Sequence, residues 1–190
     1  MSDGQPNFNL QYPSADIQKL AKEYVYKDGD DKGMLDAGKR IRKEDYSLEN
    51  LEVIYRWKSQ RKIGLFRKNS PEEIKQALKR ASEAKDVKEA VDSLTQLDGV
   101  AVRMASAILT AINPELYTVF DVRALEALGM KTNNYNVDLY VKYLEYCRST
   151  AKKHNVSLRD FDRANWWWSK KEADAAHCEE CNCPTAAVKG

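Results

Sequence analysis

The amino-acid sequence predicts an all-α protein, and three observations carry this prediction. Apolar residues recur at intervals of three and four along most of the chain, which is the spacing of amphipathic helices. Helix-start signals precede several of these stretches; Ser70 and Pro71, for example, stand directly before two glutamates. Only residues 116–120 (LYTVF) have the pattern of an extended segment. At 190 residues the chain can bury a hydrophobic core, as one domain or as two small lobes.

The expected helices follow one another with short connections. Ser47 stands at the N-cap position of one of them, and Ser157 with Asp160 forms a capping box for the last. Residues 27–40 (KDGDDKGMLDAGKR) are rich in Gly and Asp and are expected to form a loop. Gly129 is expected to close a short helix. The expected helices span residues 15–26, 48–60, 71–84, 87–97, 102–112, 121–129, 138–154 and 158–176.

Composition argues against a membrane-spanning or secreted protein. The longest apolar runs are far shorter than the ~20 residues that a spanning helix needs, and the N-terminus (MSDGQPNFNL) lacks the basic start and apolar run of a signal peptide. The four cysteines do not have the pattern of a disulfide-stabilised fold, because three of them lie close together in the tail. This cysteine pattern indicates a reducing compartment. We therefore expect a cytoplasmic protein.

The charge of the chain is balanced overall but unevenly distributed. With 31 basic and 29 acidic residues, the net charge of +2 indicates no particular partner. Residues 39–68, however, hold ten Lys or Arg against four Asp or Glu. A basic stretch of this kind either meets phosphate groups or is a solvated surface.

Residues 94–112 (LTQLDGVAVRMASAILTAI) have the pattern of two helices joined by a tight turn at residues 98–101. Gly99 permits turn angles that other residues avoid, and small residues beyond the turn let the two helices approach closely. Such a turn leaves successive N–H groups pointing outward at a helix N-terminus, which is a site for an anion such as a phosphate. The hairpin therefore predicts a sequence-independent contact with a nucleic-acid backbone.

Residues 94–124 resemble the helix-hairpin-helix DNA glycosylases, the superfamily of endonuclease III and of the adenine and alkylated-base glycosylases. The hairpin of that family reads roughly LPGVGxKTAxxxL, and this chain has LDGVAVRMASAIL in the same register. The family's active site lies further on, in a segment like VDTHVxR, and this chain has VFDVRAL there. The resemblance makes Asp121 the catalytic residue. The backbone-binding residues of the hairpin are then Gly99, Val100, Ala101 and Arg103.

Two positions depart from the family pattern. Ala101 replaces the second hairpin glycine, and Arg103 replaces the Lys nucleophile of the members that also cleave the strand. A guanidinium stays protonated and delocalised, so Arg103 cannot attack a sugar carbon and form a Schiff base. The resemblance, with this change, predicts a monofunctional glycosylase that releases a base without cutting the strand.

The chemistry expected of Asp121 follows from the reaction. A glycosylase extrudes a nucleotide from the base stack, holds its base in a pocket and breaks the N-glycosidic bond. Positive charge develops on the sugar as that bond breaks, and a carboxylate beneath the ring can stabilise the charge and position a water molecule. The alternative is that Asp121 only caps a helix, which is the commonest role of an Asp at a helix start.

Further candidates lie on either side of the hairpin. Residues 55–62 (YRWKSQRK) place Trp57 among cations, where an aromatic ring either stacks on a base or packs in the core. Tyr117 is a pocket residue or a core residue, and Arg123 either reaches a phosphate or pairs with Asp121. The candidate phosphate-binding cations of the 55–62 segment are Lys58, Arg61 and Lys62.

The tail, residues 176–190, contains the motif HCEECNC. Some relatives of endonuclease III carry an iron–sulfur cluster on four cysteines downstream of the catalytic Asp, whereas this tail has three cysteines at CxxCxC spacing. Zinc, a degenerate iron–sulfur cluster and a disordered, metal-free tail all stay open, and base release requires no cofactor. The candidate ligands are His177, Cys178, Cys181 and Cys183.

Together these features predict an all-α, helix-hairpin-helix glycosylase-like bundle of two small lobes over residues 1–175, with the hairpin at 94–112 and the catalytic segment at 116–124. The expected partner of this monomer is DNA that contains a damaged or modified base. The alternative from another class is a non-catalytic DNA-binding protein with the same hairpin, and a purely structural helical domain is the third. No short motif identifies the base, because the residues of such a pocket are dispersed along the chain.

Overall fold

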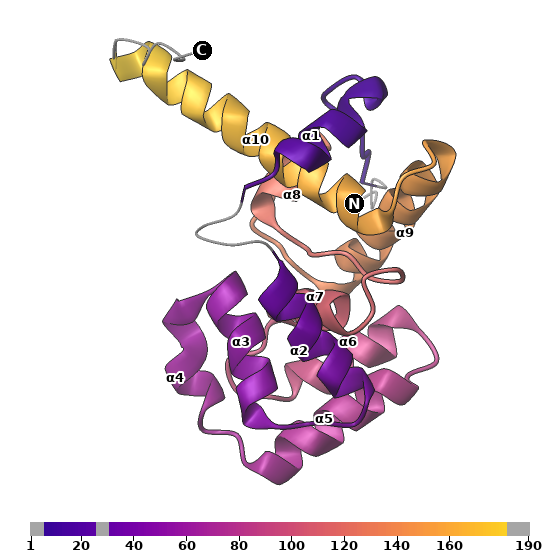
Figure 1. The fold of residues 1–190 in the computed structure, drawn as a ribbon, viewed down its shortest axis with the longest axis vertical. Helices are drawn as coiled ribbons and strands as arrows, with labels where there is room; N and C mark the ends of the chain where they lie inside the picture. Colours follow the sequence, from indigo (N-terminus) through magenta and orange to yellow (C-terminus); the bar gives the residue numbers. More distant parts are fainter. Residues whose placement is uncertain (1–5, 26–30, 182–190) are drawn as a thin grey trace, which may run out of the picture.

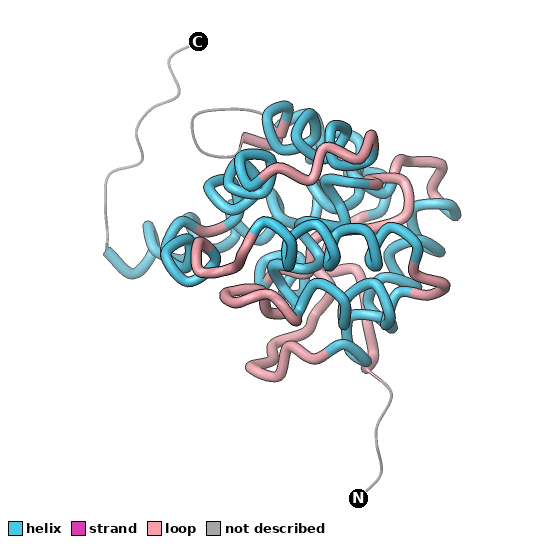
Figure 2. Tube along the Cα trace, turned by 90° about the horizontal axis from the view of Figure 1, so that it is seen from below, coloured by secondary structure: helices cyan, strands magenta, loops and turns pink. Residues whose placement is uncertain are grey.

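A computed structural model describes residues 6–25 and 31–181, apart from the side chains of Lys62 and residues 177–181. The described chain is helical and contains no β-strand, which confirms the all-α prediction (Figure 2). None of its helices is long and apolar enough to cross a membrane. The elements are η1 (Ser14–Asp16), α1 (Ile17–Glu23), α2 (Lys32–Arg42), α3 (Leu48–Lys58), η2 (Gln60–Lys62), α4 (Ile63–Phe66), α5 (Pro71–Glu83), α6 (Val87–Thr95), α7 (Val102–Ile112), α8 (Val122–Glu126), α9 (Val137–Lys153) and α10 (Leu158–Cys181).

The helices fall into two groups that lie one above the other in Figure 1. In the first group α2, α3 and α6 pack against α7, and α5 packs against α6. In the second group α1, α8 and α9 pack against α10. A contact between α6 and α9 joins the groups, and the segment between α7 and α8 runs from one group to the other (Figure 1).

Helix α7 is the centre of the first group. All nine of its residues from Met104 to Ile112 are buried, as is typical of a helix that is apolar on every side. Its close contact with α2 depends on Gly38, because a Cβ atom at that position would lie 1.9 Å from the carbonyl oxygen of Ala111. Moving either backbone away would cost free energy, since both belong to packed helices.

We expect Gly38→Ala to lower the free energy of unfolding by about 3 kcal/mol or more, because the added methyl group overpacks two backbones. The matched control is Gly64→Ala in α4, where a Cβ atom would meet nothing within 4 Å. That substitution should be neutral or stabilise by roughly 0.5–1 kcal/mol, since Ala is the better helix former. Chemical denaturation of both variants measures the difference, and equal stabilities would contradict this account of the α2–α7 contact.

Helix α2 corrects the prediction of a loop at residues 27–40. Met34, Ala37, Gly38 and Ile41 are buried at helical spacing along it. The glycines and aspartates that suggested a loop have other functions in the structure. Gly38 permits the close approach to α7, and the Asp31 side chain forms long-range ion pairs in place of a cap at the start of α2.

The start and stop signals of other helices are confirmed. Ser70 forms a capping box with Glu73 at the start of α5, and the Ser157 hydroxyl accepts from the Asp160 N–H group at 3.0 Å at the start of α10. Gly129, with a φ of +72°, ends the turn that follows α8. Ser47 precedes α3 as predicted, but its side chain forms no capping hydrogen bond. Helix boundaries were therefore predictable where polar side chains cap the backbone.

Candidate active site

The segment that leads into Asp121 is fixed by hydrogen bonds from both helix groups. The N–H group of Phe120 donates to the Ser106 hydroxyl of α7 at 2.8 Å, and the Phe120 side chain is fully buried. The carbonyl oxygens of the two preceding residues accept from the hydroxyls of Tyr140 and Tyr143 of α9, each at 3.1 Å. Because main-chain groups of this segment are held from two sides, the position of Asp121 is set by packed helices.

The carboxylate of Asp121 has three partners. Its Oδ1 accepts from the backbone N–H group of Arg123 at 3.1 Å, so Asp121 is the N-cap of α8. Its Oδ2 forms an ion pair with the ammonium group of Lys58, at the end of α3. The guanidinium of Arg103, in the first turn of α7, lies 3.5 Å from the same oxygen. Two cations from different helices therefore meet at one carboxylate oxygen.

These partners keep Asp121 ionised. Its side chain is 13% exposed, and burial alone would raise its pKa. The attraction of Lys58, the hydrogen bonds from Lys58 and the Arg123 N–H group, and the charge of Arg103 outweigh burial and lower the pKa of Asp121 from 3.8 to about 2. The carboxylate is therefore negatively charged throughout the neutral range.

The lowered pKa predicts a specific loss of stability in acid. Since the folded-state pKa of Asp121 lies below the unfolded value, its stabilisation is present above about pH 4 and is lost as the pH falls towards 2. A shift of this size corresponds to a contribution on the order of 2 kcal/mol. We expect the difference in unfolding free energy between about pH 7 and about pH 3 to be smaller in Asp121→Asn than in the wild type. Equal differences in urea titrations of the two proteins would contradict the assigned pairing.

Asp121 lies at a small cavity between the helix groups. The cavity measures about 20 Å³, enough for one water molecule. Three aromatic rings and five charged side chains contribute to its wall, so it offers both stacking surfaces and hydrogen-bonding groups. The residues that line it are Tyr24, Trp57, Lys58, Val119, Asp121, Arg159, Asp162, Arg163 and Trp166.

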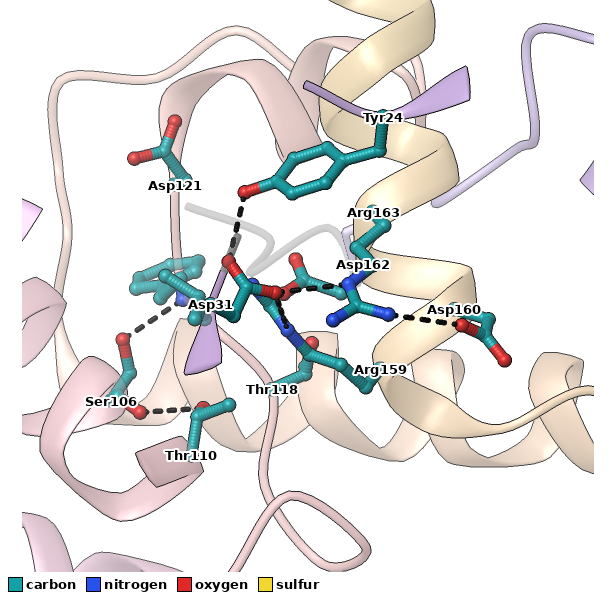
Figure 3. Close-up of polar contacts among 12 residues, drawn as sticks. Tyr24, Asp31, Ser106, Thr110, Thr118, Asp121, Arg159, Asp160, Asp162 and Arg163 are labelled. Atoms are coloured by element: carbon teal, nitrogen blue, oxygen red, sulfur yellow. Dashed lines mark hydrogen bonds and ion pairs between the residues drawn. The ribbon is translucent and has the colours of Figure 1, made fainter. Parts of the chain in front are cut away.

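A cluster of buried charges forms one side of this cavity. The carboxylate of Asp31, which is fully buried, accepts from Arg159 at 2.5 and 2.9 Å and from Arg163 at 2.9 Å (Figure 3). Arg159 also forms an ion pair with Asp162. Tyr24 points its hydroxyl at Asp31 and donates to it at 3.3 Å (Figure 3). The cluster joins the start of α2 to α10, so it fixes how the two helix groups sit against each other.

The two carboxylates of the cluster have opposite pKa shifts. Burial raises the pKa of Asp162 to about 6, and the attraction of Arg159 only partly offsets it. Burial also acts on Asp31, but Arg159 and Arg163 together lower its pKa. Asp162 is therefore the one of the two that can exchange a proton near neutral pH.

A larger hollow adjoins this cavity. It measures about 600 Å³ and is lined by residues of α1, of the α9–α10 connection and of the first turns of α10, together with Asp31. Tyr24 and Arg163 belong to the walls of both hollows. Neither Asp121 nor Lys58 is among the described residues that line the larger hollow. The Asp121 carboxylate and the Lys58 ammonium therefore belong to the smaller cavity.

The structure distinguishes the predicted DNA-contacting cations. Lys58 points inward, since its side chain is 10% exposed and pairs with Asp121. Arg103 also faces Asp121, and its guanidinium lies 4.7 Å from the centre of the Tyr135 ring. The Arg123 side chain donates to the Ser169 carbonyl of α10 at 3.3 Å, so the interaction of this residue with Asp121 is through its backbone. Arg61 is exposed, and the Lys62 side chain lies outside the described part of the chain.

Much of the basic stretch at residues 39–68 is engaged within the protein. Arg42 donates to the carbonyl of Ile112 at the end of α7, and Arg56 and Arg67 pair with Glu52. The interpretation of the whole stretch as a phosphate-binding surface is therefore too broad.

The two predicted aromatic residues have different surroundings. Trp57 is half-buried, lines the cavity and lies 5.5 Å from the guanidinium of Arg159. Tyr117 is half-buried beneath Arg148 of α9, at 5.8 Å, and does not belong to the described residues that line the cavity. Trp57 thus shares the cavity wall with Asp121, whereas Tyr117 belongs to the packing of α9.

The predicted turn between α6 and α7 is present. Gly99 has a φ of +81°, which requires glycine, whereas Ala101 has a φ of −98°, which any residue adopts. The loss of the second glycine therefore does not distort the turn. Val100 is buried. Asn69, for which the sequence predicted no role, stabilises the turn through two hydrogen bonds with the backbone of Asp98, at 2.8 and 3.1 Å.

The N-terminus of α7 leaves backbone N–H groups without partners inside the helix, as every helix does. Ala101 occupies the cap position and has no side-chain oxygen to accept from them. These N–H groups belong to the same helix turn as Arg103, which contacts Asp121. The Arg103 side chain therefore links the N-terminal turn of α7 to the carboxylate of Asp121.

The cysteine motif lies outside the described residues in its essential parts. The backbone of residues 177–181 continues α10, but the side chains of His177, Cys178 and Cys181 are not described, and neither is Cys183. The described residues contain no group of three or more His, Cys, Asp or Glu that could hold a metal ion.

The buried charge cluster was not predicted from the sequence. Arg159, Asp162, Arg163 and Trp166 follow one another at the i, i+3, i+4 and i+7 spacing of a single helix face. That face is otherwise the inward face of α10, and charged residues at core spacing are the signal that was available. Their partner Asp31 lies 128 residues before Arg159, and no local pattern connects the two.

Comparison of this chain with protein-family models, with curated proteins and with solved structures found no match.

Proposed function

We propose that this protein is a DNA glycosylase. It holds a damaged or modified base outside the DNA duplex and hydrolyses the N-glycosidic bond of that base with the carboxylate of Asp121. The observation that carries the proposal is the state of that carboxylate. It is nearly buried, ionised, and fixed at a cavity with aromatic and charged walls. A preorganised negative charge of this kind stabilises the positive charge that develops on a sugar as its base departs.

The walls of the cavity suit a nucleobase in chemistry. Trp57, Tyr24 and Trp166 provide aromatic rings on which a base can stack once the guanidinium groups that lie over these rings move aside. Asp162, with a pKa of about 6, can donate a hydrogen bond to the edge of a base when it is protonated and accept one when it is ionised. Because the cavity holds only about one water molecule, entry of a base requires side chains of its wall to move. Tyr24 and Arg163 line both this cavity and the larger hollow, so movement of their side chains would extend the cavity towards the larger hollow.

The hairpin supports DNA as the partner. The N–H groups at the start of α7 can bind a phosphate. Arg61 in η2 is exposed and can contact a second phosphate. The resemblance of residues 94–124 to the helix-hairpin-helix glycosylases agrees with both features. Because Arg103 provides no nucleophilic amine, the hairpin by itself would support base release without strand cleavage.

The second candidate is a non-catalytic DNA-binding protein. One observation favours it, since Asp121 also serves as the N-cap of α8 and as the counterion of two cations. In that case the hairpin would bind DNA and the carboxylate would only stabilise the fold.

A panel of end-labelled duplexes and single strands, each with one modified base, tests the proposal. Each sample is incubated with the protein and analysed with and without hot alkali, which breaks the strand at abasic sites. We expect at least one member to give breaks with the wild-type protein. DNA binding that weakens as salt is added, without base release from any member, would favour the non-catalytic protein.

A further inference from the structure

The nearest amine to Asp121 comes from an unexpected part of the chain. Lys58 ends α3, 63 residues before Asp121, and its ammonium pairs with Oδ2 of the carboxylate. Its side chain is 10% exposed, less than that of Asp121 itself. Both residues of the pair line the cavity that the proposed function assigns to the substrate.

We propose that Lys58 is a nucleophile that forms a Schiff base with the sugar left by base release, so that the protein also cuts the DNA strand. This inference rests on the proposed function, because it needs an abasic sugar at the cavity. It gives Lys58 a role that the sequence did not predict, since a phosphate contact was expected there.

The chemistry of the cavity wall singles out this residue. Among the described residues that line the cavity, Lys58 alone carries a primary amine. Arg103, Arg159 and Arg163 carry guanidinium groups, which stay protonated and cannot form an imine. A Lys amine condenses readily with an aldehyde, and the open form of an abasic sugar has an aldehyde at C1′.

The steps balance without a redox partner. The Lys58 ammonium gives a proton to the departing base, or to solvent when no base is present, and becomes a neutral amine. The amine attacks C1′ of the open sugar and a C–N bond forms; the carbonyl oxygen takes one proton from the amine nitrogen and one from solvent and leaves as water, so that a protonated imine results. Asp121 takes a proton from C2′, the electron pair forms the C2′–C3′ double bond, and the C3′–O bond breaks with loss of the 3′-phosphate. Hydrolysis of the imine then returns the free amine.

Asp121 has a second function in this scheme. It holds the ammonium in place before reaction, and it is the nearest described base to Lys58 when the C2′ proton must be removed. Lys58 and Asp121 would therefore act on the same sugar in sequence, from α3 and from the start of α8.

Trapping on a preformed abasic duplex tests the proposal without knowledge of the base. The duplex is incubated with the full-length protein and borohydride, which reduces an imine to a stable amine, and the adduct is digested and mapped by mass spectrometry. We expect a covalent complex whose adduct lies on Lys58. An adduct on another residue, or none, would overturn the proposal.

Variants add a second readout. Lys58→Arg keeps the positive charge beside Asp121 but cannot form an imine, so we expect the trapped complex to fall at least about 100-fold. Lys68→Arg is the matched control, because it makes the same change at an exposed lysine of the same basic stretch, and it should trap like the wild type. Circular dichroism establishes whether each variant is folded, and mapping of the wild-type adduct needs no variant.

The outcome also separates this proposal from the proposed function. Base release that is detected only after alkali treatment, without any trapped complex, would overturn the role of Lys58 and leave the glycosylase proposal standing. A complex on Lys58 without base release from the panel of modified bases would support the role of Lys58 and count against base excision. Failure of both assays would overturn both.

Discussion

Replacing Asp121 by Asn is expected to slow base release by about 10²–10⁴-fold and to leave DNA binding nearly unchanged. The amide has almost the shape of the carboxylate and can still accept from the backbone N–H group of Arg123. It carries no charge, however, and so cannot stabilise the cationic sugar. The rate of base release under single-turnover conditions measures the effect, and a salt titration of binding serves as the companion measurement.

A matched control separates catalysis from helix capping. Asp86 is the N-cap of α6, and its side chain accepts from the Glu89 N–H group at 2.8 Å, as Asp121 does from Arg123 in α8. Asp86→Asn makes the same chemical change at an equivalent position away from the cavity, and it should release base at the wild-type rate. If both substitutions slowed the reaction equally, the effect would come from the caps, and the catalytic assignment of Asp121 would be wrong.

The largest effect on stability is expected from Arg159→Met. Arg159 is 8% exposed and pairs with Asp31 and Asp162, which are 0% and 3% exposed. Its removal leaves buried carboxylates with too little compensating charge, and breaking a buried pair in this way costs about 3–5 kcal/mol. The free energy of unfolding from urea titration should fall by that amount.

Arg67→Met is the control for this measurement. Arg67 forms two hydrogen bonds with Glu52, at 2.6 and 3.1 Å, but about half of its side chain is exposed. The same substitution there should change stability little, since water replaces the lost partner. Similar losses in the two variants would mean that burial does not control the strength of the Arg159 cluster.

How far the sequence predicts the fold depends on whether its signals are local. The capping box at Ser70 and the hairpin turn at Gly99 were predictable, because a few adjacent residues determine them. Helix α2 was not, because Gly38 lowers the helix propensity of its segment while allowing it to pack on α7. That packing involves residues about 70 positions apart, as the contact between Arg42 and Ile112 illustrates, and no window of sequence contains it.

The candidate site follows the same rule. Asp121 and the hairpin residues share one short segment, so a motif could indicate them. The direction of the Lys58 side chain depends on how α3 lies against the start of α8, and the sequence grouped this residue with the candidate phosphate-binding cations instead. The pairing of Asp31 with Arg159 depends on the contact between the two helix groups. The sequence thus indicated candidate site residues such as Asp121, but it did not indicate which side chains they pair with across the cavity.

Whether Asp121 breaks the N-glycosidic bond can be tested by a search for free bases released from damaged DNA. Genomic DNA treated separately with an alkylating agent, an oxidant and ultraviolet light is incubated with the wild-type protein or Asp121→Asn, and mass spectrometry identifies the bases in the small-molecule fraction. We expect at least one modified base that the wild-type protein releases and the variant does not. No released base from any treated DNA, with DNA binding retained by both proteins, would contradict the assignment of Asp121 as the residue that breaks the N-glycosidic bond.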